Sequence, residues 1–304
     1  MPTSLPKPAA SVGVMSRERR ALVLLIAVGL GVASCSSDSD SDRDRSDDVS
    51  TTAVARSTTT TVAPTYAAIV ASEVEVDPRY RQGLARVDDG WVFSFNDGLY
   101  RTDDELTQTT TVAPAIPEEW KARGFNHIGD IDVVDGVLYA PLEQPDYEQA
   151  RQATLTYDAE TLAYIGGVDL AQHENSFVTV DPSTMIAYSM DRFGGDALVR
   201  YDVSDEWRPL EPLPMSAAIE RVQGGDVFDG AIWLSTDDDT DGVYRVDLAS
   251  GSVQPLGLIG HVDGEGEGID ATPTPAGDLH VLTLDVDVVP VRLIELVVSP
   301  SSLD

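Results

Sequence analysis

The sequence is poor in cysteine, histidine and basic residues, and it has no apolar run long enough for a membrane span. Its single cysteine, Cys35, excludes an intrachain disulfide framework, a cysteine-based zinc site and an iron–sulfur cluster. Only 20 Lys and Arg stand against 52 Asp and Glu, which gives a formal net charge of −32. Because nucleic-acid phosphates are bound by clustered positive charge, we expect no nucleic-acid partner.

Local catalytic motifs are also missing from the chain. The sequence contains no Gly-x-Ser-x-Gly elbow, Walker loop, His-Glu-x-x-His helix or dinucleotide fingerprint. By contrast, 42% of the residues are hydrophobic, and ten Tyr, six Phe and four Trp are present, as is typical of a globular protein. The sequence therefore predicts a folded domain but does not indicate which reaction, if any, it catalyses. Whether the protein is an enzyme stays open, and a non-enzymatic role is preferred.

The N-terminal part has the pattern of an export signal. In residues 16–35 (SRERRALVLLIAVGLGVASC), three arginines precede an apolar run at 21–32, and small residues lead to Cys35. This order is that of a secretory signal peptide. Residues 32–35, Val-Ala-Ser-Cys, resemble the lipobox of bacterial lipoproteins, which implies a lipid-modified (palmitate-bearing) Cys35. We expect an exported, extracytoplasmic lipoprotein attached to the cell membrane by that lipid.

Three segments follow from this pattern. Residues 1–34 are expected to be the signal peptide. Residues 35–64 are expected to be the lipidated cysteine and a tether, because they consist largely of Ser, Asp and Thr with little to bury. Residues 65–304 carry the folded domain.

Asp-Gly pairs between short β-rich runs mark that domain as all-β. The pairs at 89–90, 135–136 and 229–230 each separate two apolar runs, which is a strong hairpin signal. A short Gly-rich or polar step precedes each hairpin, and five such steps end at residues 84, 130, 176, 224 and 268, spaced by 46, 46, 48 and 44 residues. This period is that of four-stranded propeller blades, so we predict a five-bladed β-propeller.

The C-terminal unit is too short for four strands. Residues 65–76 supply a spare strand, and we expect it to close the last blade as its outer strand, since an open ring would leave unpaired edges. A β-sandwich or two β-domains with coincidental spacing is the alternative architecture.

The repeat order resembles the five-bladed propellers of the plant-type glutaminyl cyclotransferase superfamily. The resemblance rests on Gln-Gly-Leu at 82–84 and on Tyr-Asp-Ala-Glu-Thr-Leu at 157–162. It implies a binding role for Gln82. The catalytic Glu, the Asn and the channel Lys of that family would fall at Ile128, Gln223 and Leu284, so the catalytic residues are not matched. The resemblance therefore implies the architecture rather than the activity.

Aligned repeats predict rings of residues around the channel axis. One ring would comprise Arg81, His127, His173, Arg221 and Glu265, the next Gln82, Ile128, Glu174, Val222 and Gly266, then Gly83, Gly129, Asn175, Gln223 and Glu267, and then Leu84, Asp130, Ser176, Gly224 and Gly268. Polar groups gathered at a channel mouth make a binding site the default hypothesis. The ligand-binding candidates are Gln82, Asp130, Asn175, Ser176, Gln223 and Glu267.

Two chemistries suit these rings. Carboxylate and amide oxygens are ligands that Ca²⁺ prefers, so Ca²⁺ is the cofactor considered. Alternatively, a histidine with a carboxylate forms an acid–base pair, for which the catalytic candidates are His127, His173 and Glu174. A zinc site on such residues also stays open. A separate calcium loop is suggested by Asp237, Asp239 and Asp241 before Gly242, although Leu248 stands where an EF-hand has its bidentate Glu.

We therefore expect a cell-surface, lipid-anchored propeller that binds a small ligand or cation at its channel mouth. One alternative is an exported hydrolase or glutaminyl cyclotransferase-like enzyme that uses a His/carboxylate pair there. Another is a protein-interaction scaffold, in which case the partner is a protein that contacts the outer surface.

Overall fold

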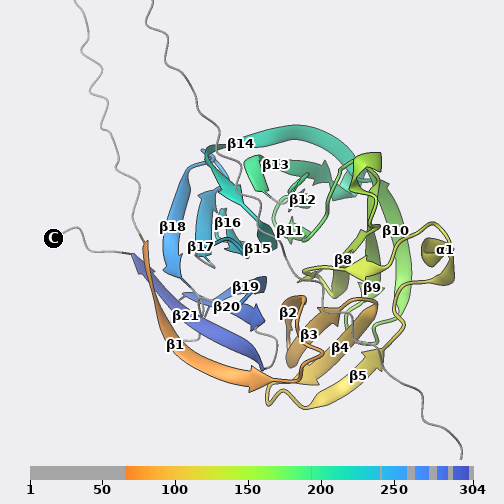
Figure 1. Ribbon diagram of the computed structural model, residues 1–304, viewed down its shortest axis with the longest axis horizontal. Coiled ribbons are helices and arrows are strands. Elements are labelled where there is room, and N and C mark those ends of the chain that lie inside the picture. The colour runs from red at the N-terminus through yellow and green to blue at the C-terminus, as the bar shows by residue number, and fades with distance from the viewer. Residues whose placement is uncertain are drawn as a thin grey trace, which may run out of the picture. The chain divides into compact units, whose positions relative to one another are not determined.

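The chain forms five antiparallel sheets arranged around a central axis in a computed structural model (Figure 1). The structure describes residues 66–192, 194–239, 242–258, 264–273, 279–286 and 290–300. Cys35, the expected signal peptide and the expected tether lie outside these ranges. The fold is a five-bladed β-propeller, as the repeat spacing predicts.

Each blade has an inner strand at the axis and an outer strand at the rim. Blade 1 comprises β2 (Gly83–Val87), β3 (Gly90–Phe95), β4 (Gly98–Asp103) and β5 (Gln108–Val112). Blade 2 comprises a split inner strand, β6 (His127–Ile128) and β7 (Asp132–Val134), with β8 (Val137–Glu143), β9 (Gln152–Asp158) and β10 (Tyr164–Leu170).

Blade 3 comprises β11 (Thr179–Asp181), β12 (Ile186–Ser189), β13 (Gly194–Asp202) and β14 (Arg208–Glu220). Blade 4 comprises β15 (Val222–Phe228), β16 (Ala231–Thr236), β17 (Gly242–Asp247) and β18 (Val253–Leu258). Blade 5 comprises β19 (Gly266–Pro273), β20 (Leu279–Val286), β21 (Val291–Pro300) and β1 (Tyr66–Val76).

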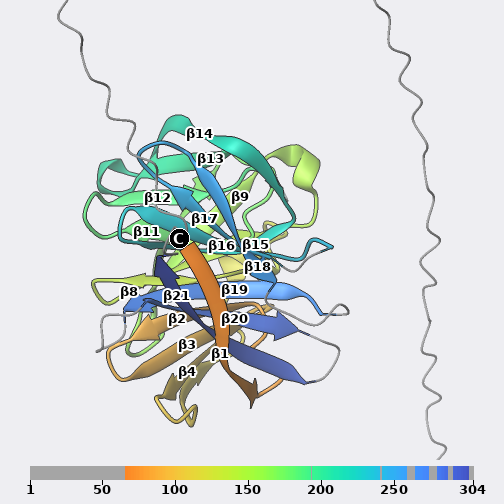
Figure 2. The ribbon, with the colours of Figure 1, turned by 90° about the vertical axis from the view of Figure 1, so that its left-hand side faces the viewer.

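Blade 5 is closed by the N-terminal strand, which confirms the expected ring closure. Strand β1 pairs antiparallel with β21 from Tyr66 opposite Pro300 to Val76 opposite Val291. Figures 1 and 2 show β1 against β21, although these strands come from opposite ends of the described chain. This pairing converts an exposed strand edge of β21 into a paired one.

The predicted hairpins are also present. The turns at 88–89, 135–136 and 229–230 each join an inner strand to the second strand of its blade. Asp135 and Asp229 have φ values of 51° and 48°, the left-handed conformation that Asp tolerates better than most residues. Short helices α1 (Glu118–Lys121), η1 (Tyr147–Gln149) and η2 (Val203–Asp205) lie in connections between strands.

The core lies between the blades rather than along the axis. One apolar cluster joins blades 1 and 2 through Val92, Leu138 and Leu155, each fully buried, and Trp120 packs on it. A second cluster joins blades 3 and 4 through Phe177, Leu198 and Leu234. Successive residues of a middle strand pack on opposite faces of the blade: on β16, Ile232 belongs to the cluster between blades 3 and 4, and Trp233 to a cluster with blade 5.

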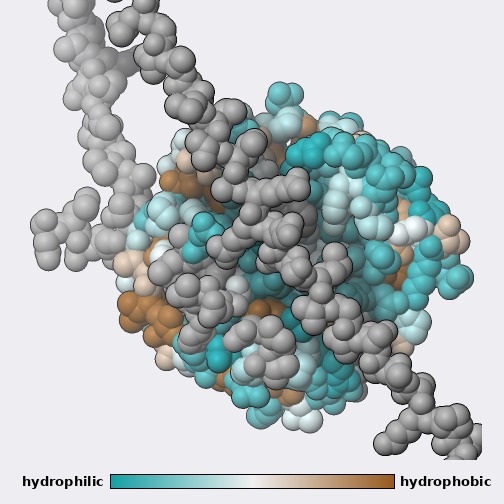
Figure 3. All heavy atoms as spheres, in the orientation of Figure 1, coloured by the Kyte–Doolittle hydropathy of each residue, from teal (hydrophilic) through white to brown (hydrophobic). Residues whose placement is uncertain are grey.

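Strand β1 carries an exposed apolar patch, whereas much of the rim on the face that Figure 3 shows is hydrophilic. In Figure 3, hydrophilic residues dominate the rim near β14, whereas apolar residues gather on the side of β1. Ile69, Val70 and Val74 on β1 are 67%, 46% and 46% exposed. Within the described ranges, no helix has the length and apolar character needed to cross a membrane.

The structure corrects the predicted ring register in two blades. The repeat alignment predicts that Leu84 and Ser176 are equivalent to Asp130. In the structure, Asp130 instead forms a parallel β-bridge with Phe177. The Leu84 N–H donates to the Asp130 carboxylate as the Ile131 N–H of blade 2 does, so Leu84 corresponds to Ile131. Gly83 and Phe177 are therefore the equivalents of Asp130. The error is one residue in each blade, which nearby turn motifs cannot reveal.

Candidate functional site

Asp130 lies at the axis and joins all five blades. Its carboxylate accepts hydrogen bonds from four backbone N–H groups, those of Leu84, Ile131, Gly225 and Ile269, at 3.1, 3.1, 3.0 and 3.3 Å. Its backbone carbonyl accepts from Val178 at 3.3 Å, which adds blade 3. Burial raises the pKa of Asp130, and the backbone donors oppose that rise. The repeat alignment predicts Asp130 in the channel but does not predict this structural role.

Other predicted ligand-binding residues are also used between blades. Asn175 is fully buried, donates from Nδ2 to the Ala153 carbonyl at 2.6 Å and accepts from the Ser189 hydroxyl at 2.9 Å. The Ser176 hydroxyl donates to the Val222 carbonyl at 2.9 Å, which ties blade 3 to blade 4. These side chains hold the ring together, so their polar atoms are directed into the protein.

A second layer of carboxylates lies two residues further along the inner strands than the level of Asp130. The Asp132, Asp226 and Asp270 carboxylates each accept a backbone N–H from the next blade, donated by Val180 at 2.7 Å, Ala271 at 2.6 Å and Arg86 at 2.8 Å. Burial raises the pKa of all three carboxyl groups, and that of Asp132 to about 6. Their mutual repulsion adds to this effect.

The channel mouth is the end of the axis at which the inner strands begin. Glu267 is 8% exposed there, and its carboxylate faces the Gln82 amide, whose Nε2 lies 3.5 Å from Oε2. Burial raises the pKa of Glu267 well above its ordinary value, and the nearby Glu265 carboxylate raises it further. The structure thus brings together two of the predicted ligand-binding residues, while Gln223 is half-buried at the start of β15.

A second pair of glutamates lies at the same mouth, between blades 2 and 3. Glu143, at the end of β8, is 4% exposed and accepts from the Asn175 N–H at 2.6 Å and the Tyr147 hydroxyl at 3.4 Å. Burial raises the pKa of Glu143 to about 7, and the neighbouring Glu174 carboxylate contributes to the rise. Glu174 itself is 9% exposed. Glu143 is not predictable from the repeat alignment, because it lies on a second strand, outside the aligned inner-strand steps.

The two candidate histidines have different surroundings. His173 Nδ1 lies 3.0 Å from Asp191 Oδ2, and the His173 N–H donates to Asp191 Oδ1 at 2.7 Å, so Asp191 fixes both ring and backbone. His127 pairs with Glu143 in the β6–β8 ladder, and burial lowers the pKa of its imidazole. His173 with Asp191 is therefore the acid–base pair that the structure assembles.

The metal-site candidates are only partly described. Within the ranges that the structure describes, no three His, Cys, Asp or Glu side chains are placed to hold a metal ion. In the proposed calcium loop, the Asp237 carboxylate pairs with Arg221 and Asp239 is exposed, whereas Asp241 lies outside the described residues. The loop prediction therefore stays untested.

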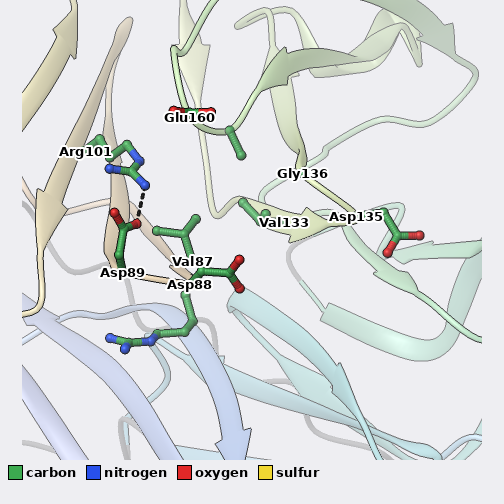
Figure 4. A pocket seen from close by; sticks show the side chains of 10 residues that line it. Val87, Asp88, Asp89, Arg101, Val133, Asp135, Gly136 and Glu160 are labelled. Atoms are coloured by element: carbon green, nitrogen blue, oxygen red, sulfur yellow. Dashed lines mark hydrogen bonds and ion pairs between the residues drawn. The ribbon is translucent and has the colours of Figure 1, made fainter.

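A groove of about 960 Å³ lies at the opposite end of the channel, between blades 1 and 2. Figure 4 shows Val87 and Val133 beside this space, with the ion-paired Arg101 and Asp89 on blade 1. The carboxylates of the groove are exposed, whereas the mouth holds three buried carboxyl groups. A buried carboxyl group with a perturbed pKa is the stronger mark of a functional site, so we place the candidate site at the mouth.

Comparison with known proteins places the chain by fold. No protein-family model matches the sequence, and no curated protein matches it. An exo-β-1,3-galactanase from Phanerochaete chrysosporium, solved with β-1,3-galactotriose, has a TM-score of 0.50 at 11% identity, covering 75% of this chain and 64% of that one. The likeness is one of fold alone.

Two other solved structures are more distant in shape. The Dos1 propeller has a TM-score of 0.41 at 12% identity, covering 72% of this chain and 68% of that one. A chain of the mitotic checkpoint complex has a TM-score of 0.42 at 12% identity, covering 71% and 66%. This chain thus spans about two thirds of the length of the structures it matches.

Proposed function

We propose that the protein binds a small, positively charged ligand at the channel mouth without catalysing its chemical conversion. The observation that carries this proposal is the set of three buried glutamates at the mouth, Glu143, Glu174 and Glu267, each at most 9% exposed. Burying a carboxylate costs free energy unless a positive charge or hydrogen-bond donors compensate it. A cationic ligand adds to that compensation at Glu143 and Glu267, whose pKa values are raised by burial and by neighbouring carboxylates.

The acidity of the whole chain supports the same ligand class. A formal net charge of −32 attracts cations and repels anions. The ligand class that we propose is an organic ammonium, whose N–H groups form charge-assisted hydrogen bonds with carboxylates. Ca²⁺ remains a probe that must be included, since the Asp237–Asp241 loop also predicts it.

The test is a melting-temperature titration of the purified, chelator-treated protein with Ca²⁺, Mg²⁺, a diamine and a quaternary ammonium. A ligand at about 100 times its Kd stabilises the native state by about 2.7 kcal/mol, equivalent to a rise of about 5–10 °C for a domain of this size. We expect one cation to give a saturable rise that Glu267→Gln removes. The matched control is Glu160→Gln, an exposed glutamate in the turn between β9 and β10. A rise that survives Glu267→Gln would contradict the proposal.

An enzymatic role is the second candidate, because the structure pairs His173 with Asp191 at 3.0 Å beside Glu174. Such a pair suits proton transfer in hydrolysis, and Glu143, with its pKa of about 7, suits a general acid. Hydrolysis of p-nitrophenyl esters or glycosides that His173→Ala abolishes would favour the enzyme. Cation binding that His173→Ala leaves unchanged would favour the binding protein.

We also propose that the protein acts outside the cytoplasm, attached to the membrane by a lipid on Cys35. The support is the sequence pattern of residues 16–35 alone. Mass spectrometry of the mature N-terminus tests it, with a diacylated Cys35 as the expected result. If Cys35→Ser and the unaltered protein both partition into the detergent phase, the lipid anchor is refuted.

A further inference from the structure

Strand β1 has an open edge at the rim of the propeller. It is the outer strand of blade 5, and no other described strand pairs with its outer edge. Figure 2 shows β1 along the outside of the blade. In an antiparallel edge strand, every second residue directs its N–H and C=O groups away from the neighbouring strand. About half of the 11 residues of β1 therefore present backbone groups to which a further strand can bind.

The other four outer strands have features that hinder such pairing. Strand β14 contains Pro209, Pro212 and Pro214, and β18 contains Pro255, and proline has no N–H to donate. Strand β5 has only five residues, and β10 contains two glycines at 166–167 beside a register shift. Strand β1 contains neither proline nor glycine and is longer than β5, β10 and β18. Its edge is therefore the one best suited to pair with another chain.

Strand β1 consists of two halves of different chemistry, divided by a register shift between Val70 and Ser72. The first half has no charged residue, and its Ile69 and Val70 side chains are 67% and 46% exposed. Because these two residues are adjacent, their side chains lie on opposite faces of the strand. The second half carries two exposed glutamates, Glu73 and Glu75. A strand that pairs with β1 therefore meets apolar groups at one end and negative charge at the other.

A small apolar pocket of about 100 Å³ lies beside the first half of β1, between blades 4 and 5. The residues that line it are Ala68, Val70, Val243, Leu256, Gly257 and Leu296. A Cβ atom added to Gly257 would meet no atom within 4 Å, so this side of the pocket is open. Where a strand is added to a sheet edge, main-chain hydrogen bonds supply affinity and side-chain pockets supply specificity. The edge of β1 and this pocket supply both.

We propose that the edge of β1 binds an extended segment of a partner protein as an additional antiparallel strand. The segment carries Lys or Arg opposite Glu73 and Glu75, and branched apolar residues opposite the first half of β1, one of which enters the pocket. Charge favours this occupant over a second copy of the chain, because two copies with a formal net charge of −32 repel each other, whereas a basic segment is attracted. The site lies at the rim and does not depend on the cation site at the channel mouth.

The probe is the peptide fluorescein-Arg-Thr-Arg-Thr-Val-Ile-Val-Thr-amide, titrated with the purified full chain and followed by fluorescence anisotropy. We expect saturable binding that is absent when Glu replaces both Arg. N-methylation of alternate backbone nitrogens tests the strand pairing. Methyl groups in one frame face β1 and should weaken binding at least about 10-fold, whereas those in the other frame face away and should have little effect. No saturable binding of the basic peptide, or equal effects of the two frames, would overturn the proposal.

Substitutions in each half of β1 locate the peptide. Ile69→Thr should weaken peptide binding about 3- to 10-fold, and its matched control is Ile165→Thr, at an isoleucine that is 59% exposed on the outer strand β10. Glu75→Gln should weaken binding about 2- to 5-fold, and its control is Glu211→Gln, at an exposed glutamate on the outer strand β14. If Ile69→Thr lowers the melting temperature, the comparison of the two glutamates decides. Equal affinities in the variants and their controls would place the peptide elsewhere and overturn the proposal.

Sedimentation velocity distinguishes a partner segment from a second copy. We expect the full chain to stay monomeric at micromolar concentration, and a concentration-dependent dimer that Ile69→Thr dissociates would assign the edge to a second copy and overturn the proposal. Glu267→Gln is expected to leave peptide affinity unchanged, and Ile69→Thr to leave cation binding unchanged. Failure of the mouth to bind cations and failure of the edge to bind the peptide are therefore distinguishable.

Discussion

At the scale of the residue, Asp130 determines how the blades meet at the axis. A carboxylate accepts at both oxygens, and Asp130 uses both for four backbone N–H groups from blades 1, 2, 4 and 5. In Asp130→Asn, one oxygen would become an NH₂ group facing backbone donors. We expect the free energy of unfolding to fall by at least about 3 kcal/mol, measured by urea denaturation.

The matched control for this change is Asp88→Asn. Asp88 is an exposed carboxylate in the turn after β2, so its loss should change stability by less than about 0.5 kcal/mol. Equal stability of Asp130→Asn and the unaltered protein would mean that the axis is held by other contacts.

The channel carboxylates Asp132, Asp226 and Asp270 predict how the free energy of unfolding changes with pH. Their folded-state pKa values lie above the ordinary value, about 6 for Asp132, so the folded state binds more protons than the unfolded state between about pH 4 and pH 6. Their contribution to stability is therefore fully present below the unfolded pKa and is lost as pH rises through the folded pKa. We expect a larger free energy of unfolding at pH 5 than at pH 7.5.

Asp132→Asn should reduce that pH dependence without breaking the blade contact. A single oxygen of Asp132 accepts from both the Val180 N–H and the Thr179 hydroxyl, and an Asn carbonyl oxygen can do the same. Urea denaturation at both pH values measures the difference. A pH dependence that is unchanged in Asp132→Asn, or stability that rises from pH 5 to pH 7.5, would be inconsistent with a protonated cluster.

At the scale of the element, the inner strands approach one another closely where glycine replaces a side chain. A Cβ atom added to Gly224 would lie 2.7 Å from Asp130 Oδ2 and 2.6 Å from the Ser235 hydroxyl. Gly224→Ala should therefore lower the free energy of unfolding by about 1–3 kcal/mol. Gly166→Ala in β10 is the control, because its Cβ would meet only Thr156 Oγ1, at 3.9 Å. Similar denaturation midpoints for the two variants would contradict this packing.

Strand β1 gives the second prediction at this scale. A chain that begins at Thr65 keeps β1, whereas a chain that begins at Asp77 exposes the edge of β21 and the apolar residues beneath it. We expect the first to keep the melting temperature of the whole chain, and the second to melt at a lower temperature or to aggregate. Equal melting temperatures for both chains would show that closure by β1 does not stabilise the ring.

The elements were predictable where the signal is local. Asp-Gly turns at 135–136 and 229–230 mark hairpins that the structure contains, and the leftover strand at 65–76 follows from the short last unit. The register at the axis was not predictable in this way, because Asp130 contacts residues 95 and 139 positions away. A usable signal was present: Asp132, Asp226 and Asp270 recur two residues after the equivalent positions Asp130, Gly224 and Gly268.

At the scale of the whole molecule, the ring places polar groups from distant blades at one opening. Glu267 comes from blade 5 and Gln82 precedes blade 1, while Glu143 and Glu174 lie at the junction of blades 2 and 3. Gln82, Glu174 and Glu267 could be selected from the repeat alignment. Glu143 and Asp191 could not, because second strands and their loops vary in length and lie outside the aligned steps.

The proposed function requires that a cation binds to these mouth carboxyl groups. Its most direct test is calorimetric titration at pH 7 with the cation that most raises the melting temperature, in two buffers of different ionisation enthalpy, which counts the protons exchanged. Because Glu143, with a pKa of about 7, is partly protonated there and a cation favours its ionised form, we predict net proton release that Glu143→Gln reduces. Binding without proton exchange, or no binding at all, would contradict the claim.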